Sequence, residues 1–369
     1  MRVVVLHASF TTTGGAEVYV RMLCEELMAE GHSVKLITGD DFGIPPHSKT
    51  QSKKVRYWFQ LMDIFGRSRK KIILAVDEFE PDLVHLHNWA RLRSSTVKQI
   101  SKKYPMLHTI HDYYTIDPSG ISSDRYHETT EKIIKLRTFI LLRKYRKILF
   151  HFPALRTKER FMIYSGIKLE NFLVFPLNIK LPDYEFQVSD EHLTFAYIGQ
   201  LEPHKGILEF AKEFEKFSNH SMSLIIAGDG SEREAIIEIA SRPNGISYAG
   251  WLDPKGKKEL FDRVSWLVFP SKWFENFPLV CCEALASGVP IVSTDISIPP
   301  MANEGAVLTY GSSSSKKDVN EILVHINNMS EAEYLQAVES ALSSRQNFQD
   351  LTERRAAYDL LMKKRGRHS

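Results

Sequence analysis

Residues 270–294 read PSKWFENFPLVCCEALASGVPIVST, and this stretch decides the fold class of the 369-residue chain. The apolar run Trp266–Phe269 comes directly before it and predicts a buried strand. A helix is predicted next, because Asn276 can cap a helix and Pro278 suits a first turn, where proline has no N–H to lose. Strand, turn and helix start, in this order, are typical of a parallel α/β sheet that binds its ligand at the turn.

Two glutamates, Glu275 and Glu283, stand eight positions apart across this predicted helix start. The amides of the first turn, with Phe277 and Leu279 as the candidates, are predicted to bind an anion. The two carboxylates could then hydrogen-bond the hydroxyl groups of the molecule that carries the anion. A phosphate with hydroxyl-rich groups on both sides describes a nucleotide sugar. The alternative is structural, because glutamates near a helix start also complement the helix dipole.

The E-x7-E spacing, followed by A-L-A-S-G-V-P-I-V-S-T, resembles the signature of the family 4 retaining glycosyltransferases (glycosyltransferase group 1). The resemblance implies an α/β GT-B fold, in which two Rossmann-like domains have parallel sheets facing a central cleft. It also implies that Glu275 is catalytic and lies against the donor sugar, together with Asn276, and that Glu283 holds the donor ribose. The family usually has glycine where this chain has Pro278.

A second segment, residues 199–206, reads GQLEPHKG and resembles the family's G-R-L-x-x-x-K-G segment. The resemblance implies that Lys205 binds the donor diphosphate. Gln200 stands in the place of the family's arginine, so one cation is missing from the predicted diphosphate site, which puts catalytic efficiency in doubt. Trp251 and Leu252 match the family's loop near the nucleotide base.

The first half of the chain begins with a predicted strand, a turn containing Gly14 and Gly15, and a helix over residues 16–30. The three-glycine dinucleotide fingerprint is absent, which disfavours an NAD enzyme. In the resembled family the G-G-A-E string approaches the donor diphosphate, which assigns Gly15 to that group. The T-I-H-D string likewise assigns His111, as a catalytic residue, to the donor sugar. A hydrogen-bonded scaffold role for His111 is the alternative.

The two halves of the chain differ in charge. Residues 1–180 hold 29 Lys and Arg against 18 Asp and Glu, and residues 181–369 hold 19 against 27. This difference supports an N-terminal acceptor-side domain over residues 1–176, a linker over 177–189 and a C-terminal donor domain over 190–347. A terminal helix at about 348–364 is expected, by the same resemblance, to cross back onto the first domain.

Residues 49–71 hold eight basic residues and one acid, with aromatic and aliphatic residues between them. Such a segment is typical of an interfacial element attracted to an anionic membrane. An ordinary solvated helix face is the alternative, and nucleic acid is disfavoured because no binding module accompanies the charge. The sequence shows no bilayer-spanning run and no signal peptide, so a cytoplasmic location, peripheral on the inner face of the membrane, is expected.

The predicted activity is therefore that of a retaining hexosyltransferase that moves a sugar from a nucleotide diphosphate sugar to a glycan or lipid-linked glycan, in surface polysaccharide or glycoconjugate biosynthesis. No cofactor and no metal are expected, because the chain contains no D-x-D motif. Two alternatives use the same fold: a catalytically silent subunit that binds donor or glycan, and a sugar phosphorylase or epimerase.

Overall fold

The computed structural model describes residues 1–11, 14–45, 53–117, 128–179, 181, 193–217, 222–311, 318–350 and 352–366. The chain forms two compact units, Met1–Ile179 with Asp350–Ser369, and Lys180–Gln349. The first unit extends three residues past the predicted boundary at 176. Leu177 and Ile179 are buried, so they belong to a packed unit and not to a linker.

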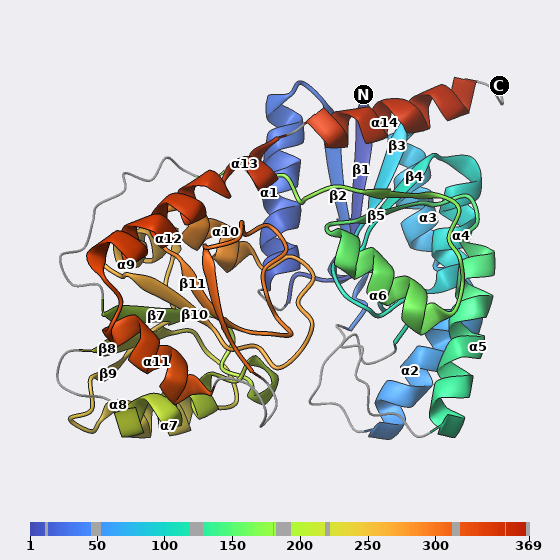
Figure 1. Cartoon of the computed structure of the whole chain (residues 1–369). Helices are drawn as coiled ribbons and strands as arrows, with labels where there is room; N and C mark the ends of the chain where they lie inside the picture. The colour runs from blue at the N-terminus through green and yellow to red at the C-terminus, as the bar shows by residue number, and fades with distance from the viewer. Residues whose placement is uncertain are drawn as a thin grey trace. The chain divides into compact units, whose positions relative to one another are not determined.

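The first unit is built on a six-stranded parallel sheet in the order β2-β1-β3-β4-β5-β6. Its strands are β1 (Arg2–His7), β2 (Ser33–Thr38), β3 (Leu83–Leu86), β4 (Met106–Thr109), β5 (Leu149–Phe152) and β6 (Phe172–Val174). Val3 of β1 pairs with Val34 and Leu83 on its two sides. Helices cover both faces of the sheet (Figure 1), which explains why its central strands β3 and β4 are buried along their whole length.

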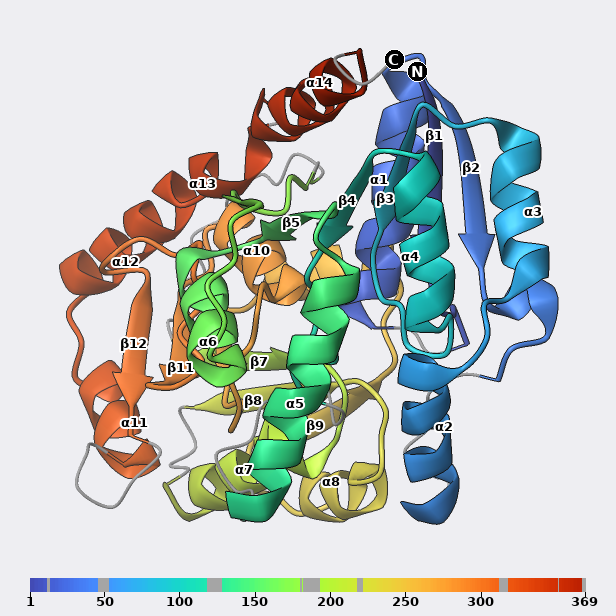
Figure 2. The same cartoon turned by 90° about the vertical axis from the view of Figure 1, so that its right-hand side faces the viewer.

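The helical segments of the first unit are α1 (Gly15–Ala29), η1 (Asp40–Phe42), α2 (Lys53–Phe65), α3 (Lys70–Phe79), α4 (Ser94–Lys103), α5 (Glu128–Lys144), α6 (Leu155–Ser165) and α14 (Thr352–Gly366). Figure 2 shows α5 beside α6. Helix α14 packs against β3 and β4. It is tied to α1 by Arg354, whose buried guanidinium pairs with Glu26 at 2.6 Å and Glu30 at 3.1 Å.

The single helix predicted at 348–364 is wrong in its first part. The structure has a short α13 (Gln346–Gln349) and then α14, with Asp350 between them. The carboxylate of Asp350 accepts hydrogen bonds from the N–H and the hydroxyl of Thr352. A side chain that satisfies the first amide of a helix favours a new start there, so the chain breaks at Asp350.

The second unit is built on another six-stranded parallel sheet, in the order β12-β11-β10-β7-β8-β9, with helices on both faces. Its strands are β7 (Thr194–Ile198), β8 (Ser223–Ala227), β9 (Ile246–Gly250), β10 (Trp266–Phe269), β11 (Ile291–Thr294) and β12 (Val307–Tyr310). Its helical segments are η2 (Pro203–Lys205), α7 (Ile207–Phe217), α8 (Arg233–Ala240), α9 (Pro254–Phe261), α10 (Leu279–Ala286), α11 (Val319–Asn327) and α12 (Glu331–Ser343), followed by α13.

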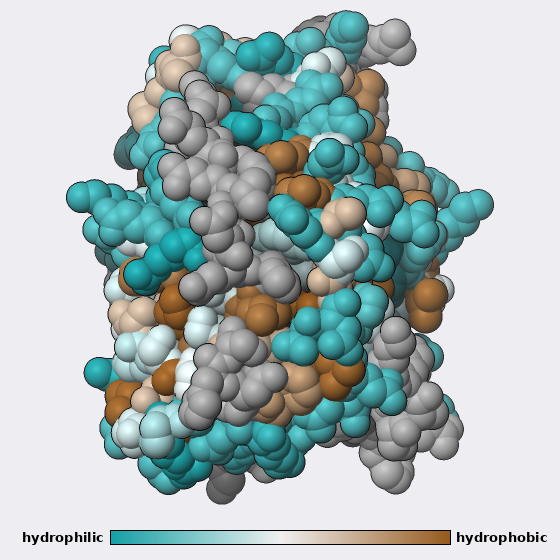
Figure 3. Space-filling view, turned by 60° about the vertical axis from the view of Figure 1, so that its left-hand side comes forward, coloured by the Kyte–Doolittle hydropathy of each residue, from teal (hydrophilic) through white to brown (hydrophobic). Residues whose placement is uncertain are grey.

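Hydrophilic residues predominate on the face drawn in Figure 3, where the hydrophobic ones form separate patches. Among the described helices, none is both long and apolar enough to cross a bilayer. The three cysteines, Cys24, Cys281 and Cys282, are buried as free thiols.

Candidate functional site

The two strongest sequence motifs meet at one point of the second unit. Strand order reverses between β7 and β10, because β8 and β9 lie on one side of β7 while β10, β11 and β12 lie on the other. The loops that leave the carboxyl ends of β7 and β10 therefore border the position where open α/β sheets bind ligands. Gly206 lets them approach, since its φ is +73° and a Cβ there would lie 2.3 Å from the carbonyl oxygen of Pro270.

The carboxylate of Glu275 is the centre of this junction. Its Oε1 accepts hydrogen bonds from Lys205 Nζ at 2.6 Å, from Ser271 Oγ at 2.8 Å and from Trp273 Nε1. The ammonium of Lys205 also lies 4.9 Å from the centre of the Trp273 ring, within cation–π range. The structure therefore joins the two residues that the sequence had assigned separately to the donor sugar and the diphosphate.

Burial and charge act in opposite directions on Glu275. Burial alone would raise the pKa of its carboxyl group, but the Lys205 charge and the hydrogen bonds from Lys205, Trp273 and Ser271 hold that pKa below its ordinary value. Glu275 is consequently a carboxylate at neutral pH. It is a fixed negative charge beside a fixed positive one, at the carboxyl edge of a parallel sheet.

Helix α10 starts later than predicted. Pro278 is the N-cap residue, with φ −74° and ψ 112°, and Leu279 is the first helical residue. The prediction that Asn276 caps the helix and Pro278 lies in its first turn is therefore wrong. Proline's fixed φ suits both the N-cap and the first turn of a helix. The extended ψ of Pro278 shows that this residue is the N-cap.

This later start changes which amides can face an anion. Phe277 precedes the helix, so the prediction that its amide belongs to the first helical turn is wrong. The N–H groups of Leu279 and Val280 have no acceptor among the described residues. Asn276 is buried in the loop just before them.

Glu283 lies in the second turn of α10 and forms an ion pair with Lys257 of α9. Both side chains are largely buried, at 23% exposed for Lys257 and 14% for Glu283. Helix α9 is capped by Asp253, which accepts a hydrogen bond from the Gly256 N–H. Sequence reasoning missed Lys257, because it stands 26 positions before Glu283 and the two share no local pattern.

Three other predicted residues of the second unit lie nearer the surface. Gln200 is exposed, and its side chain has no hydrogen-bond partner among the described residues. Trp251 is 61% exposed and Leu252 is half-buried, in the loop between β9 and α9. That loop leads directly into the helix that carries Lys257.

The first unit places its own predicted residues at the carboxyl ends of β1 and β4. Gly15 is the first residue of α1, and Gly14 before it is extended. Glu17 holds this turn: its carboxylate accepts the Gly14 N–H at 2.9 Å and lies 3.2 Å from His7 Nε2. Glu17 of the G-G-A-E string therefore links the end of β1 to the start of α1.

His111 follows β4 and is hydrogen-bonded to a histidine that follows the neighbouring strand β3. Its Nε2 lies 2.8 Å from His87 Nδ1, and the two rings stack with 5.1 Å between centroids. Burial lowers the pKa of both histidines well below its usual range. Burial also raises the pKa of Asp112 to about 6. The residues that follow β3 and β4 therefore contribute to one cluster.

A further buried chain of hydrogen bonds runs across the sheet behind this pair. His151 Nε2 donates to the Phe175 carbonyl, so its Nδ1 must accept, and it does so from the Thr109 hydroxyl at 2.9 Å. Thr109 Oγ1 then accepts from His85 Nε2 at 2.7 Å, and His85 Nδ1 accepts from the Tyr358 hydroxyl at 2.8 Å. Each imidazole is therefore held neutral and in one tautomer, between β5 and α14.

The segment at 49–71 lies only partly within the described structure. Lys49 lies outside it, as do the side chains of residues 53–57. The visible part of α2 exposes Trp58, Leu61 and Phe65 and buries Asp63, which accepts hydrogen bonds from the Tyr114 hydroxyl and the Arg91 N–H. Within the described residues, no group of three or more histidine, cysteine or acidic side chains is arranged to hold a metal.

Two family models match the chain: "Glycosyltransferase Family 4" over residues 13–156 and "Glycosyl transferases group 1" over residues 192–344. An uncharacterized glycosyltransferase of Methanocaldococcus jannaschii is 24% identical over 311 residues, which cover 77% of each chain. An O-antigen chain mannosyltransferase B of Escherichia coli is 28% identical over 138 residues, which cover 35% of each chain.

Solved structures share the fold over the full length. The sucrose-phosphate synthase of Thermosynechococcus elongatus has a TM-score of 0.70 at 16% identity, covering 100% of this chain and 98% of its own. The Anabaena protein HepE, solved in complex with UDP-glucose, has a TM-score of 0.67 at 15% identity, covering 99% and 100%.

Proposed function

We propose that this chain, which belongs to the group 1 and family 4 glycosyltransferases with the GT-B fold, is a retaining hexosyltransferase that uses a nucleotide diphosphate sugar. The observation that carries the proposal is the pairing of Lys205 with Glu275, beside the free amides of α10, at the sheet's switch point. That arrangement offers a cation and N–H donors to a diphosphate and a carboxylate to sugar hydroxyls. The UDP-glucose complex of HepE supports the donor class.

The proposed roles follow from these positions. Lys205 and the Leu279 amide bind the diphosphate, and Gly15 remains a predicted contact to the same group. Glu283 binds the ribose, and the loop with Trp251 and Leu252 contacts the base.

Glu275 and Asn276 contact the transferred sugar, a role also predicted for His111. The departing phosphate stabilises the positive charge that develops on the sugar, so no carboxylate needs to become a covalent nucleophile. The proposed reaction needs no divalent metal, since the sequence lacks a D-x-D motif.

The proposed acceptor is a glycan or a lipid-linked glycan of surface polysaccharide biosynthesis. The similarity to an O-antigen mannosyltransferase supports this class. Docking of residues 49–71 on an anionic membrane would bring the enzyme to such an acceptor. The exposed Trp58, Leu61 and Phe65 of α2 support that docking.

The test is a panel of UDP, GDP, ADP and CDP sugars, incubated with the purified full chain, with and without EDTA. One donor should be hydrolysed slowly and transferred faster when an acceptor glycan is added, with the anomeric configuration kept in the NMR spectrum of the product. Binding without turnover would instead identify a catalytically silent subunit, which Gln200 suggests. Phosphorolysis or epimerisation of the sugar would identify the other alternative.

Glu283→Gln should weaken donor binding without slowing the chemical step. A ribose contact is made equally in the ground and transition states, so we expect the donor KM to rise about tenfold with kcat within about twofold. Asp262→Asn is the matched control, because Asp262 also pairs with a lysine of α9, Lys258, but near the surface. An unchanged KM for Glu283→Gln would refute the ribose assignment.

Gln200→Arg should increase activity. The Gln200 side chain is exposed, so an arginine has room, and a restored charge-assisted hydrogen bond to the diphosphate contributes about 1.5–3 kcal/mol. That corresponds to at least a tenfold gain in kcat/KM for the donor. Gln200→Met, which removes the amide and adds no charge, should not reproduce the gain. Lower activity of Gln200→Arg would mean that the glutamine is adapted to this donor.

A further inference from the structure

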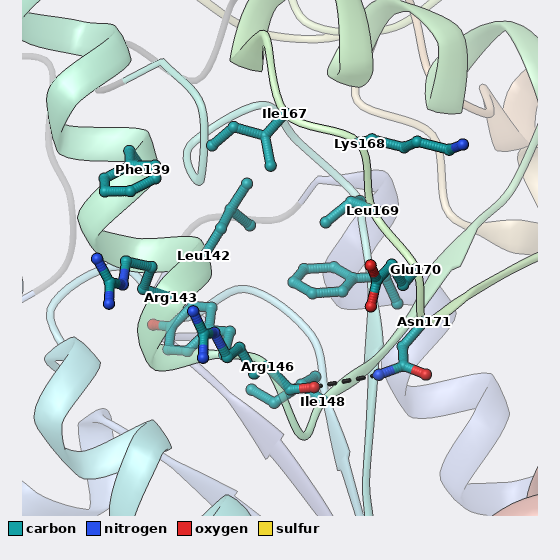
Figure 4. A pocket seen from close by; sticks show the side chains of 12 residues that line it. Phe139, Leu142, Arg143, Arg146, Ile148, Ile167, Lys168, Leu169, Glu170 and Asn171 are labelled. Carbon is teal, nitrogen blue, oxygen red and sulfur yellow. Dashed lines mark hydrogen bonds between the residues drawn. The ribbon is translucent and has the colours of Figure 1, made fainter.

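We propose that the first unit holds a separate lipid site: a pocket between α5 and residues 167–171 that binds the phosphate of an anionic lipid, with the exposed face of α5 against the leaflet. The pocket has a volume of about 400 Å³. It is lined by residues from α5, β5 and the connection from α6 to β6 (Figure 4).

The lining combines apolar walls with cations. Phe139, Leu142, Ile167 and Leu169 provide apolar surface, and Arg143, Arg146 and Lys168 provide positive charge. None of the three cations pairs with a carboxylate among the described residues. Glu170 is the one acidic residue of the lining, so the pocket is positive overall. A phosphate with an apolar tail fits this chemistry, because the guanidinium groups can bind the phosphate and the walls can cover carbon.

The outer face of α5 continues the same chemistry along the helix. Ile133, Leu136 and Phe139 are 59%, 61% and 46% exposed, and their spacing of three places them on one side. Residues 132–147 contain seven Lys and Arg and no Asp or Glu, and of the seven only Arg137 is buried. Exposed apolar side chains between cations are typical of a helix that lies in the headgroup region of an anionic bilayer.

This pocket is distinct from the candidate functional site. It lies where β5 and β6 begin, whereas His111 and Gly15 lie where strands of the same sheet end. Ligands of open parallel sheets bind at the carboxyl ends, so the pocket is at the wrong edge to be a donor or acceptor site. The inference therefore does not rest on the proposed activity.

Helix α2 adjoins this surface. Lys144, at the end of α5, donates to the Ile64 carbonyl and lies 6.0 Å from the Phe65 ring, which is 64% exposed. Phe65, one of the exposed apolar residues of the 49–71 segment, therefore lies beside the end of α5. A docked leaflet would contact α5, with α2 as a flank.

The experiment measures co-sedimentation of the full chain with vesicles of phosphatidylcholine alone and with 30% phosphatidylglycerol. The pair Arg143→Gln and Arg146→Gln should weaken binding to anionic vesicles at least tenfold. Two matched pairs lose the same charge elsewhere: Lys212→Gln with Lys216→Gln on α7, and Lys70→Gln with Lys71→Gln at the start of α3. The Lys212 and Lys216 pair should change binding to anionic vesicles less than twofold. The Lys70 and Lys71 pair should weaken that binding less than the Arg143 and Arg146 pair does.

A second measurement separates a headgroup site from non-specific adsorption. Monomeric dihexanoylphosphatidylglycerol should bind the parent, and Ile167→Trp, which fills the pocket and keeps its cations, should abolish that binding. Inorganic phosphate should bind at least tenfold more weakly. Equal losses for all charge pairs, equal binding of neutral vesicles, or equal affinity for free phosphate would each overturn the proposal. If Ile167→Trp does not fold, the vesicle binding of the Arg143→Gln and Arg146→Gln pair, compared with that of the two matched lysine pairs, still tests the proposal.

Discussion

Replacing Glu275 by glutamine should reduce kcat about a hundredfold and leave the donor KM within about threefold. The carboxylate accepts hydrogen bonds from Lys205, Ser271 and Trp273, so it is rigidly placed, and it remains charged at neutral pH. Glutamine keeps the shape and removes the charge. A preorganised charge that interacts with the developing positive charge of the sugar contributes about 3 kcal/mol, equal to two orders of magnitude in rate.

Donor binding should survive the same change, because Lys205 is released from its carboxylate partner and can bind the diphosphate more strongly. Glu209→Gln is the matched control: Glu209 pairs with Lys272 of the same β10 loop, but its side chain is 51% exposed. We expect Glu209→Gln to change kcat less than twofold. Steady-state kinetics with the donor found in the panel would measure both. A tenfold rise in KM at constant kcat would show that Glu275 binds the ground state.

Much of the second unit's site could be predicted from sequence, because its pieces are local. The apolar run at 266–269 is β10, and the glutamates at 275 and 283 lie before and within α10, as their spacing required. The start of the helix could not be fixed, since proline fits two adjacent positions equally well. The contact between Lys205 and Glu275 could be found only with the strand order, which brings loops 70 residues apart together.

The first unit shows more clearly which contacts could not be predicted from the sequence. His111 was predicted from its local T-I-H-D string, but its hydrogen bond to His87 depends on β3 and β4 being neighbours. The link from His85 to Tyr358 spans 273 residues and has no local signal. The positive charge of α5 is visible in the sequence, but its exposed apolar face is not. Hydrophobic periodicity does not tell which side of a helix a core covers.

Buried histidines should make the first unit far more acid-sensitive than the second. His85, His87, His108 and His151 are at most 2% exposed, and burial lowers the pKa of each, to about 3 for His108 and for His151. In the unfolded chain these groups titrate near 6.5, so below that pH the unfolded state binds more protons. Stability is complete above about pH 6.5 and is lost as the pH falls.

At pH 5, each histidine that stays neutral in the folded state lowers the free energy of unfolding by about 2 kcal/mol. Four such histidines lower it by about 8 kcal/mol, which is comparable to the whole stability of a domain. The raised pKa values of Asp63, Asp112 and Glu353 act in the opposite direction, because these carboxyl groups bind protons more readily in the folded state. After burial, repulsion from the other histidines in their protonated form and from the charge of Arg354 lowers the pKa of His85 further.

The measurement is urea unfolding at pH 7.5, 6.0 and 5.0, followed by pulsed hydrogen exchange so that peptides of each unit report separately. The first unit should lose most of its stability by pH 5, while the second, whose described histidines His204 and His325 reach the surface, should change little. His108→Leu should reduce the slope of the first unit's free energy of unfolding against pH by up to about 1.4 kcal/mol per pH unit, which is the contribution of one proton. His325→Gln should leave that slope unchanged. Equal acid sensitivity in both units would mean that the imidazoles become protonated without unfolding. The buried imidazoles between Tyr358 and Phe175 would then not be the cause of acid unfolding in the first unit.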